Sequence, residues 1–384
     1  MTDSMLAEEA KGFGCPYEDF NEDFFSQILR EYALSLVTMT VERYPHVVTS
    51  GSALLLLTHP QTNSSAFWCP ELAHNLAALK SDNPVTAARG IGQILLNLSC
   101  SGVPGAWDVT LEQPCRFHWG KYLLPDTQTL AVESDGHTAL VNFSNSNGGR
   151  VIRFEAVEGA GDWSNDETEV IPHINPGDSS ILLVTDTLLK QFDLPQPDFP
   201  VLKEIGKAQL DSVNECLNLL RQHSPACSVW IERVLRYLCL VQSPIDAMHS
   251  GSFEGYFGFV FMTDRPDPVK SAEMMVHECS HQYISILTRF TALTADDGRL
   301  YYSPFVRKDR PADRILLAYH AFANVESFYK DCIRAGIRVS HSKGQIEQLR
   351  PDLDLVERAL VSDVNFTAYG RRVMDSLLTN RGKV

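Results

Sequence analysis

The sequence has no pair of cysteines spaced as Cys-x-x-Cys, although its 384 residues include nine cysteines. The cysteines are scattered and odd in number, so reduced thiols are predicted rather than a disulfide scaffold or a cysteine zinc site. Basic residues are also few, with 33 Lys and Arg against 48 Asp and Glu and a net charge of −15. This acidic balance argues against nucleic acid and anionic membranes as partners, because phosphate groups attract a basic surface.

Long hydrophobic runs are missing as well. The most apolar stretches, ALLLLT at 53–58 and ILLVTDTLL at 181–189, are far too short to cross a bilayer. The N-terminal MTDSMLAEEAKGF has neither a basic start nor an apolar core, so no signal peptide is predicted. With 44% hydrophobic and 21% charged residues, the composition is typical of a soluble globular protein, and a cytoplasmic location is expected.

The region 1–200 is predicted to mix helices and strands. Apolar residues recur at helical spacing over 20–44 and 84–99. Between 128 and 187, short runs rich in β-branched residues are separated by Gly, Asn and Asp, which predicts strands and hairpins. The proline-rich LPQPDFP at 194–200 predicts a linker, so the mixed region is expected to end there.

The region 201–384 is predicted to be mainly helical, which makes the whole chain an α+β protein. Apolar residues at helical spacing predict helices over 201–222 and 226–241. The run GYFGFVFMT at 255–263 predicts one strand between these helices and the rest of the region.

Two further helices have clear start signals. Asp267 and Pro268 are typical of an N-cap and a first turn, and the helix is expected to reach Phe290. Pro311 opens another helix, which is expected to end near Ala335 because a glycine follows. The segment between the two helices is predicted to be a loop with one short strand.

The helix predicted over 268–290 carries the pattern His277-Glu278-x-x-His281. Histidines four residues apart lie one turn apart on one face, so both imidazoles can reach one metal ion. Glu278 is about 100° round the helix from His277 and can contact a metal-bound water or orient a ligand. The alternative is a chance pattern of two solvated histidines. The motif's position in a strongly predicted helix favours the metal site.

A third ligand is required, because two histidines hold an ion poorly. The next helix offers His320 and Glu326, which are six residues apart and therefore do not share a face. Asn324 is one turn after His320. We prefer His320 as the third metal ligand, and Glu326 would serve instead in a zinc peptidase.

Two kinds of chemistry fit these residues. In a zinc peptidase, the metal polarises the peptide carbonyl and Glu278 takes a proton from the bound water. In an oxygenase, iron(II) held on one face leaves positions open for a 2-oxo acid and O₂. The second reaction needs a carboxylate clamp, which arginine supplies. The basic segment YYSPFVRKDRPADR at 301–314 offers Arg310 and Arg307 as candidates.

Several pieces in order resemble the HExxH-type peptide β-hydroxylases, which are iron(II)- and 2-oxoglutarate-dependent enzymes acting on ribosomally made precursor peptides. The pieces lie within about residues 245–335, and the Ser-Pro to Arg-Pro segment is the most discriminating. They are SGSFEGYFGFVFM (250–262), SAEMMVHECSHQYI (271–284), YYSPFVRKDRP (301–311) and HAFANVESFY (320–329).

The resemblance implies that His277 and His281 bind iron(II), with a histidine of the next helix as third ligand. It also implies an arginine that binds 2-oxoglutarate, O₂ as oxidant, and hydroxylation of a β-carbon in a peptide side chain. When the chain is aligned with such relatives on Arg310-Pro311, the position of their third histidine corresponds to Leu317. His320 lies three residues later in this chain. Glu278 then orients a ligand or water.

The expected partner is a precursor peptide, and the strands between 128 and 187 are a candidate for binding its leader. A non-enzymatic reading remains open, in which the helical scaffold grips a peptide without an active metal.

Overall fold

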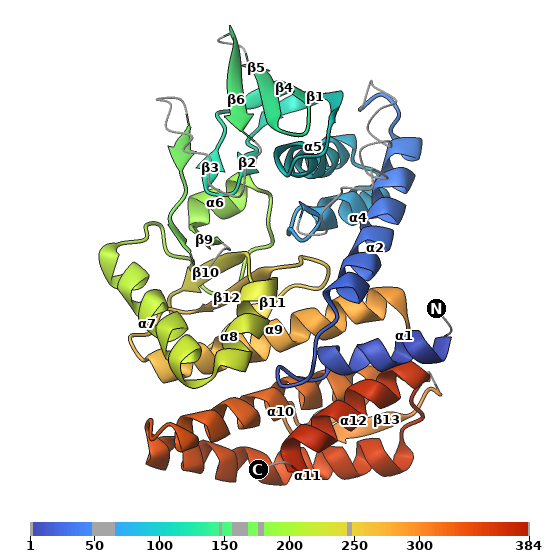
Figure 1. Ribbon diagram of the computed structural model, residues 1–384, viewed down its shortest axis with the longest axis vertical. Coiled ribbons are helices and arrows are strands. Elements are labelled where there is room, and N and C mark those ends of the chain that lie inside the picture. The colour runs from blue at the N-terminus through green and yellow to red at the C-terminus, as the bar shows by residue number, and fades with distance from the viewer. Residues whose placement is uncertain are drawn as a thin grey trace.

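A computed structural model describes the chain over residues 3–47, 66–145, 148–155, 168–175, 180–243, 248–295 and 297–382. Helices and several small sheets occur together, which confirms the α+β class. The molecule is elongated (Figure 1), with an antiparallel sheet at one end, a five-stranded sheet in the middle and a layer of helices at the other end.

The N-terminal helical elements precede the antiparallel sheet in the chain, and the last of them packs against it. They are α1 (Asp3–Glu9), the 3-10 turn η1 (Ala10–Phe13), α2 (Glu22–Arg43), α4 (Leu72–Ser81) and α5 (Pro84–Cys100). The helices predicted over 20–44 and 84–99 are confirmed as α2 and α5. Asn21 and Asn83 cap them, each side chain accepting hydrogen bonds from backbone N–H groups that the helix itself leaves unpaired.

The strands predicted between 128 and 187 are confirmed. The antiparallel sheet has the order β1-β4-β5-β6, formed by β1 (Gly105–Cys115), β4 (Thr127–Ser134), β5 (Thr138–Asn145) and β6 (Gly148–Glu155). The predicted strand RVIRFEAVE extends beyond residue 155, where it lies outside the described residues. Three short strands form a second small sheet: β2 (His118–Trp119), β3 (Tyr122–Leu123) and β7 (Glu169–Val170).

The central sheet takes its strands from both sides of the boundary predicted at residue 200. Its order is β11-β12-β10-β9-β8, with β8 (His173–Ile174), β9 (Ile181–Val184), β10 (Tyr237–Val241), β11 (Ser250–Ser252) and β12 (Phe259–Thr263). β10 pairs in parallel with β9 and β12. A parallel pair needs a long crossover, which α6 (Asp186–Gln191), α7 (Lys207–His223) and α8 (Pro225–Val234) supply between β9 and β10. The predicted boundary therefore falls inside one sheet.

The helix predicted over 226–241 is wrong in its second half. α8 ends at Val234, and residues 237–241 form β10, in which every side chain is buried. A strand that is buried on both faces is apolar throughout, so its spacing does not distinguish it from a buried helix.

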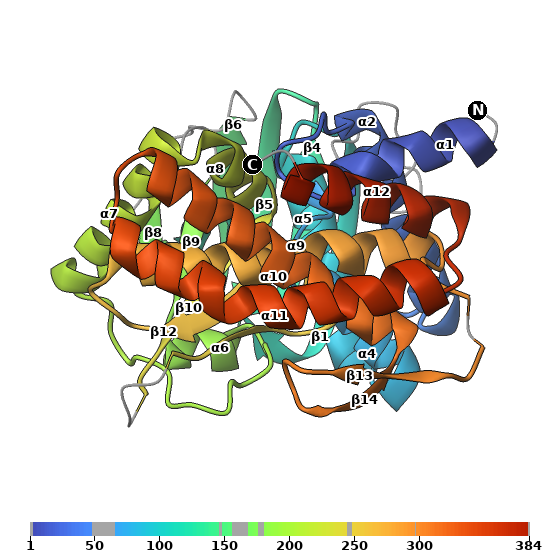
Figure 2. The ribbon, with the colours of Figure 1, turned by 90° about the horizontal axis from the view of Figure 1, so that it is seen from below.

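The C-terminal region consists of stacked helices and one hairpin. The helices are α9 (Pro268–Phe290), α10 (Ala312–Arg334), α11 (Val339–Asp363) and α12 (Ala368–Gly382). α9 and α10 confirm the two helices predicted from their start signals. The loop predicted between them contains two strands, β13 (Leu300–Ser303) and β14 (Lys308–Pro311), rather than one. Figure 2 shows α9, α10 and α11 side by side, with the hairpin beside them.

A buried group of hydrogen-bonded side chains joins α4 to the small sheet and to the central sheet. Glu71 immediately precedes α4, and its Oε1 lies 3.3 Å from Nε2 of His118 and 2.7 Å from the Tyr237 hydroxyl, which donates to it. The Gln93 side chain of α5 donates a hydrogen bond to the His118 carbonyl and accepts one from the His118 N–H. Burial alone would raise the pKa of Glu71, but His118, His74 and the Tyr237 hydroxyl together outweigh burial and lower that pKa. Glu71 is therefore ionised in the folded protein.

We expect Glu71→Gln to lower the free energy of unfolding by about 2–4 kcal/mol at pH 7, because it leaves His118 without its charged partner. The folded-state pKa of Glu71 lies below the ordinary value of 4.5, so its contribution is present above that pH and is lost as the pH falls through the folded-state pKa. Urea unfolding from pH 7 to pH 3 should show the two proteins converging. A constant difference would contradict the assignment, and Glu169→Gln, at an exposed carboxylate, is the control.

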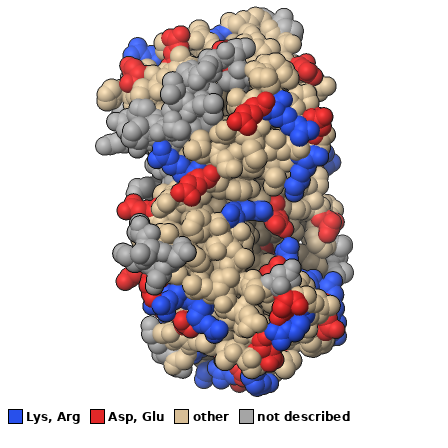
Figure 3. All heavy atoms as spheres, turned by 90° about the vertical axis from the view of Figure 1, so that its right-hand side faces the viewer, with Lys and Arg blue, Asp and Glu red and all other residues tan. Residues whose placement is uncertain are grey.

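The cysteines and the distribution of charged side chains are consistent with what the composition predicts. All nine cysteines are buried and none forms a disulfide, as predicted. None of the described helices is long and apolar enough to cross a membrane. On the face shown in Figure 3, basic and acidic side chains are interspersed, and neither sign forms an extended patch among the described residues drawn there.

Candidate metal centre

Two histidines of α9 bring their ring nitrogens together. His277 and His281 are one helical turn apart, both side chains are half-buried, and their Nε2 atoms lie 3.2 Å apart. Two nitrogens bound to one tetrahedral ion at about 2.05 Å would be about 3.3 Å apart. The pair therefore has the spacing of two ligands on a single ion.

Both imidazoles are neutral at pH 7. Burial, followed by the charges of His281 and His320, holds the pKa of His277 well below its usual value. Burial also lowers the pKa of His281 to about 4. Neutral imidazole is the form that binds metals, so near neutral pH protons do not compete with an ion for these nitrogens.

Glu278 is directed at the central sheet. Its Oε1 accepts a hydrogen bond of 2.8 Å from the Ser250 hydroxyl, and its Oε2 accepts one of 3.1 Å from the Ser252 hydroxyl. Both serines belong to β11. Burial raises the pKa of Glu278 to about 7, and the two serine hydrogen bonds act in the opposite direction. The carboxylate thus ties β11 to α9 one residue away from His277.

His320 of α10 has the hydrogen-bonding pattern of a metal ligand. Its Nε2 lies 2.9 Å from the carbonyl oxygen of Phe13, and a carbonyl only accepts, so Nε2 carries the hydrogen and Nδ1 the lone pair. Nδ1 is buried and has no hydrogen-bond partner among the described residues. Metal-binding histidines typically donate their other N–H to a carbonyl or carboxylate in this way.

His320 lies close to the pair without joining it. It interacts electrostatically with both His277 and His281, and burial lowers its own pKa to about 3. Asn324 links the two helices, with its Nδ2 3.3 Å from the Ser280 hydroxyl. No three His, Cys, Asp or Glu side chains stand at metal-holding distances anywhere in the described ranges. Among the described residues, the structure therefore brings two candidate ligands together, and His320 interacts with them without completing a group of three.

Aromatic rings cover one side of the pair. The Phe322 ring of α10 lies 4.6 Å from the His277 ring, measured between centroids. Phe305, between β13 and β14, stacks on Phe322 at 4.3 Å. The hairpin is therefore held against the histidines by apolar contacts.

The predicted arginines belong to this hairpin. Arg310 lies in β14 opposite Tyr301 and is half-buried, whereas Arg307 lies in the turn and is exposed. Neither side chain forms a hydrogen bond or an ion pair with the described residues. Both guanidinium groups are therefore available to a bound carboxylate, and Arg310 is the more enclosed of the two.

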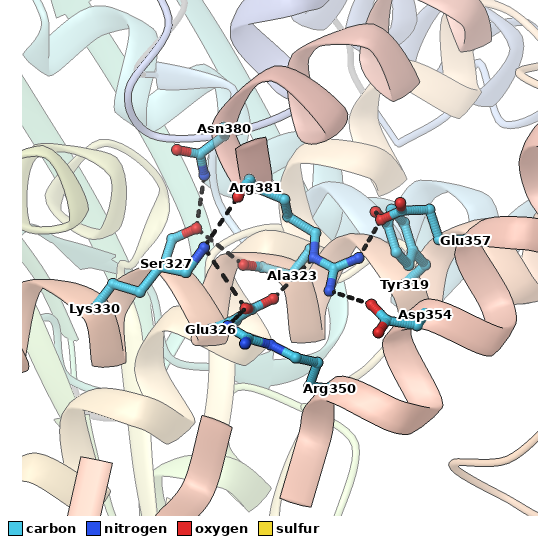
Figure 4. A network of polar contacts seen from close by, with 10 residues as sticks. All are labelled: Tyr319, Ala323, Glu326, Ser327, Lys330, Arg350, Asp354, Glu357, Asn380 and Arg381. Atoms are coloured by element: carbon cyan, nitrogen blue, oxygen red, sulfur yellow. Dashed lines mark hydrogen bonds and ion pairs between the residues drawn. The ribbon is translucent and has the colours of Figure 1, made fainter. Parts of the chain in front are cut away.

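Glu326, the alternative third ligand, belongs to a different site. Its carboxylate accepts a hydrogen bond of 2.8 Å from Nε of Arg381 and lies 3.4 Å from Arg350 and 3.6 Å from Lys330. Figure 4 shows this network between α10, α11 and α12. Because six residues separate it from His320, Glu326 projects from another face of α10. Its placement does not support a role as a metal ligand.

Three contacts of the site were not predicted from the sequence. Ser250 and Ser252 hold Glu278, and their spacing of two residues in a strand is a signal that both face one side. The Phe13 carbonyl that orients His320 gives no such signal, because it is a backbone group more than 300 residues away in the chain.

Comparison of the sequence with models of known protein families gives no match, and comparison with curated proteins gives none either.

Proposed function

We propose that the protein is an iron(II)- and 2-oxoglutarate-dependent dioxygenase that hydroxylates a side-chain β-carbon of a ribosomally made peptide. The observation that carries the proposal is the pair of neutral, half-buried histidines, His277 and His281, with Nε2 atoms 3.2 Å apart. The resemblance of about residues 245–335 to peptide hydroxylases suggests the metal, the cosubstrate and the peptide.

The donor atoms present suit iron(II). Nε2 of His277, Nε2 of His281 and Nδ1 of His320 would hold it, and the Phe13 carbonyl would keep His320 in the required tautomer. Bound iron(II), together with 2-oxoglutarate, supplies the activation of O₂. Three nitrogen ligands leave further positions on the metal open for these two molecules.

The hairpin would bind the cosubstrate and exclude water. A guanidinium group forms two parallel hydrogen bonds with a carboxylate, so Arg310, with Arg307 as the alternative, would hold the distal carboxylate of 2-oxoglutarate. The stacked rings of Phe305 and Phe322 would keep water away from the metal side of His277.

A zinc peptidase is the second candidate. The pKa of Glu278 near 7 favours it, since such a group can act as a general base at neutral pH. Two observations weigh against it. Both oxygens of Glu278 are engaged by β11, and Glu326, the ligand this candidate requires, is held by Arg381.

Glu278→Gln separates the two functions, because glutamine keeps hydrogen bonds to the serines but cannot accept a proton. We expect the variant to retain iron-dependent conversion of 2-oxoglutarate to succinate within about tenfold of wild type. A general base contributes about 10²–10⁴ to a rate, so a peptidase would lose that factor. Succinate release in air with iron(II), and cleavage of a mixed fluorogenic peptide set with zinc, are the two assays. Zinc-dependent cleavage by wild type that Glu278→Gln abolishes, without succinate formation, would contradict the proposal.

A further inference from the structure

Solvent reaches the central part of α9 along one line of side chains. Within residues 271–287, all of which the structure describes, every residue is buried except Glu273, His277, His281 and Ser285. These four follow one another at intervals of four residues, which places them along one face of the helix. The face that presents the histidine pair therefore continues to Glu273, one turn nearer the start of α9.

Helix α10 lies against this face and positions Glu273. Phe322 contacts the ring of His277, and the Tyr329 hydroxyl donates a hydrogen bond of 2.6 Å to Oε2 of Glu273. Tyr329 itself is fully buried. Four residues of an α-helix rise about 6 Å, so Glu273 is about 6 Å from His277 along the helix axis. A ligand that covers the histidines can therefore also reach this carboxylate.

The Glu273 carboxylate has no cationic partner in the described part of the chain. Neither oxygen forms an ion pair there, and Lys270 acts on the carboxylate only through its charge. Burial is the largest influence on the pKa of Glu273, and that pKa is raised above the ordinary value of 4.5. A half-buried carboxylate without a cation costs the fold free energy, and such groups are typical of binding sites.

A positively charged group is the partner that this carboxylate lacks. A metal ion would need further ligands, and no three metal-binding side chains lie together in the described ranges. An ammonium or guanidinium group needs only one carboxylate, with which it forms a charge-assisted hydrogen bond. The net charge of −15 on the whole chain favours the approach of such a group.

From these observations we infer that Glu273 binds a basic side chain, lysine or arginine, of the peptide that lies along this face of α9. An extended peptide advances about 3.3 Å per residue, so the helical rise of about 6 Å corresponds to about two residues. The basic residue is therefore expected within about two positions of the residue that lies at the histidine pair. The inference rests on the proposed function, which supplies the peptide.

Four variants separate the charge of Glu273 from its hydrogen bond. Glu273→Gln removes the charge and keeps an oxygen that can accept from Tyr329, and Glu273→Lys reverses the charge. Tyr329→Phe keeps the carboxylate and removes its hydrogen bond. Glu347→Gln, at an exposed carboxylate of α11, is the control for the general effect of negative charge.

The probes are three mixtures of dye-labelled, C-terminally amidated seven-residue peptides. The central residue is lysine in the first mixture, uncharged norleucine in the second and glutamate in the third. The other positions are random combinations of Ala, Ser, Thr, Val and Asn. Binding to the full-length, metal-free protein is measured by fluorescence anisotropy.

We expect wild type to reach half-saturation with the lysine mixture at a concentration at least about tenfold lower than with the norleucine mixture, because one charge-assisted hydrogen bond is gained. The preference should fall to within about twofold in Glu273→Gln and should turn toward the glutamate mixture in Glu273→Lys. Tyr329→Phe and Glu347→Gln should keep a preference for lysine of at least about threefold.

A second test uses wild type alone and does not depend on how the variants fold. A carbodiimide joins a carboxylate and a neighbouring amine through an amide bond. With the lysine mixture, the peptide should become attached at Glu273, which mass spectrometry of the digested protein identifies. Attachment only at other carboxylates would overturn the inference.

Equal binding of the lysine and norleucine mixtures by wild type would also overturn it, as would a lysine preference that persists unchanged in Glu273→Gln. Because metal is absent from these assays, their failure is separate from that of the proposed function. Succinate formation without a lysine preference that depends on Glu273 would refute only the inference. Such a preference without succinate formation would refute only the proposed function.

Discussion

The His277→Ala variant is expected to bind iron(II) at least about 100-fold more weakly than wild type and to form no succinate. Metal-binding free energies of about 10–16 kcal/mol are shared among three or four ligands, so removing one costs several kcal/mol. Iron retained after anaerobic dialysis, measured colorimetrically, gives the result. The fold should persist, because the His277 side chain is half-buried and its removal leaves the hydrogen bonds between Glu278 and β11 in place.

The matched control is His137→Ala, at an exposed histidine in the turn between β4 and β5. It should retain the iron content and activity of wild type. If His277→Ala kept one equivalent of iron, the α9 histidines would not be the metal site. If it still formed product, the proposal that these histidines hold the catalytic metal would be wrong.

Arg381→Met is expected to lower the free energy of unfolding by about 3–5 kcal/mol, the largest loss of stability predicted for this protein. Arg381 is 11% exposed and Glu326 is 2% exposed, so the substitution leaves a buried carboxylate without its main partner. Arg381 also pairs with Asp354 and Glu357, which join α12 to α11. Urea unfolding monitored by circular dichroism measures the loss.

Two further measurements are controls for the Arg381→Met variant. Arg350→Met, at an arginine that is 56% exposed, should cost less than about 1 kcal/mol. Iron binding by Arg381→Met should equal that of wild type under conditions in which it is folded, because the network braces helices and holds no metal. Loss of iron without loss of stability would restore Glu326 as a candidate ligand.

The sequence predicted those parts of the fold that are specified locally. Asp267 marks a helix start because its side chain accepts hydrogen bonds from the unpaired N–H groups of the first turn. The spacing of His277 and His281 determines a shared helix face once the helix itself is predicted. These features depend on residues within one or two turns of each other.

Features that depend on distant parts of the chain were not predictable in the same way. β10 was assigned to a helix because a strand with both faces buried has no alternation to detect. Six-residue spacing showed that His320 and Glu326 face different ways, but not which of them faces α9. That choice depends on the positions of Arg381 and Phe13, both far from α10 in sequence.

We propose that the α9 histidines, with His320, hold an iron(II) ion to which a 2-oxo acid binds. The most direct test is anaerobic titration of metal-free protein with iron(II) and then 2-oxoglutarate, monitored for the visible charge-transfer band of an iron–2-oxo acid chelate. We expect a band that saturates at one equivalent of iron, is absent in His281→Ala, and needs more 2-oxoglutarate in Arg310→Ala. Stoichiometric zinc binding at the same histidines, with no band at any 2-oxoglutarate concentration, would contradict it.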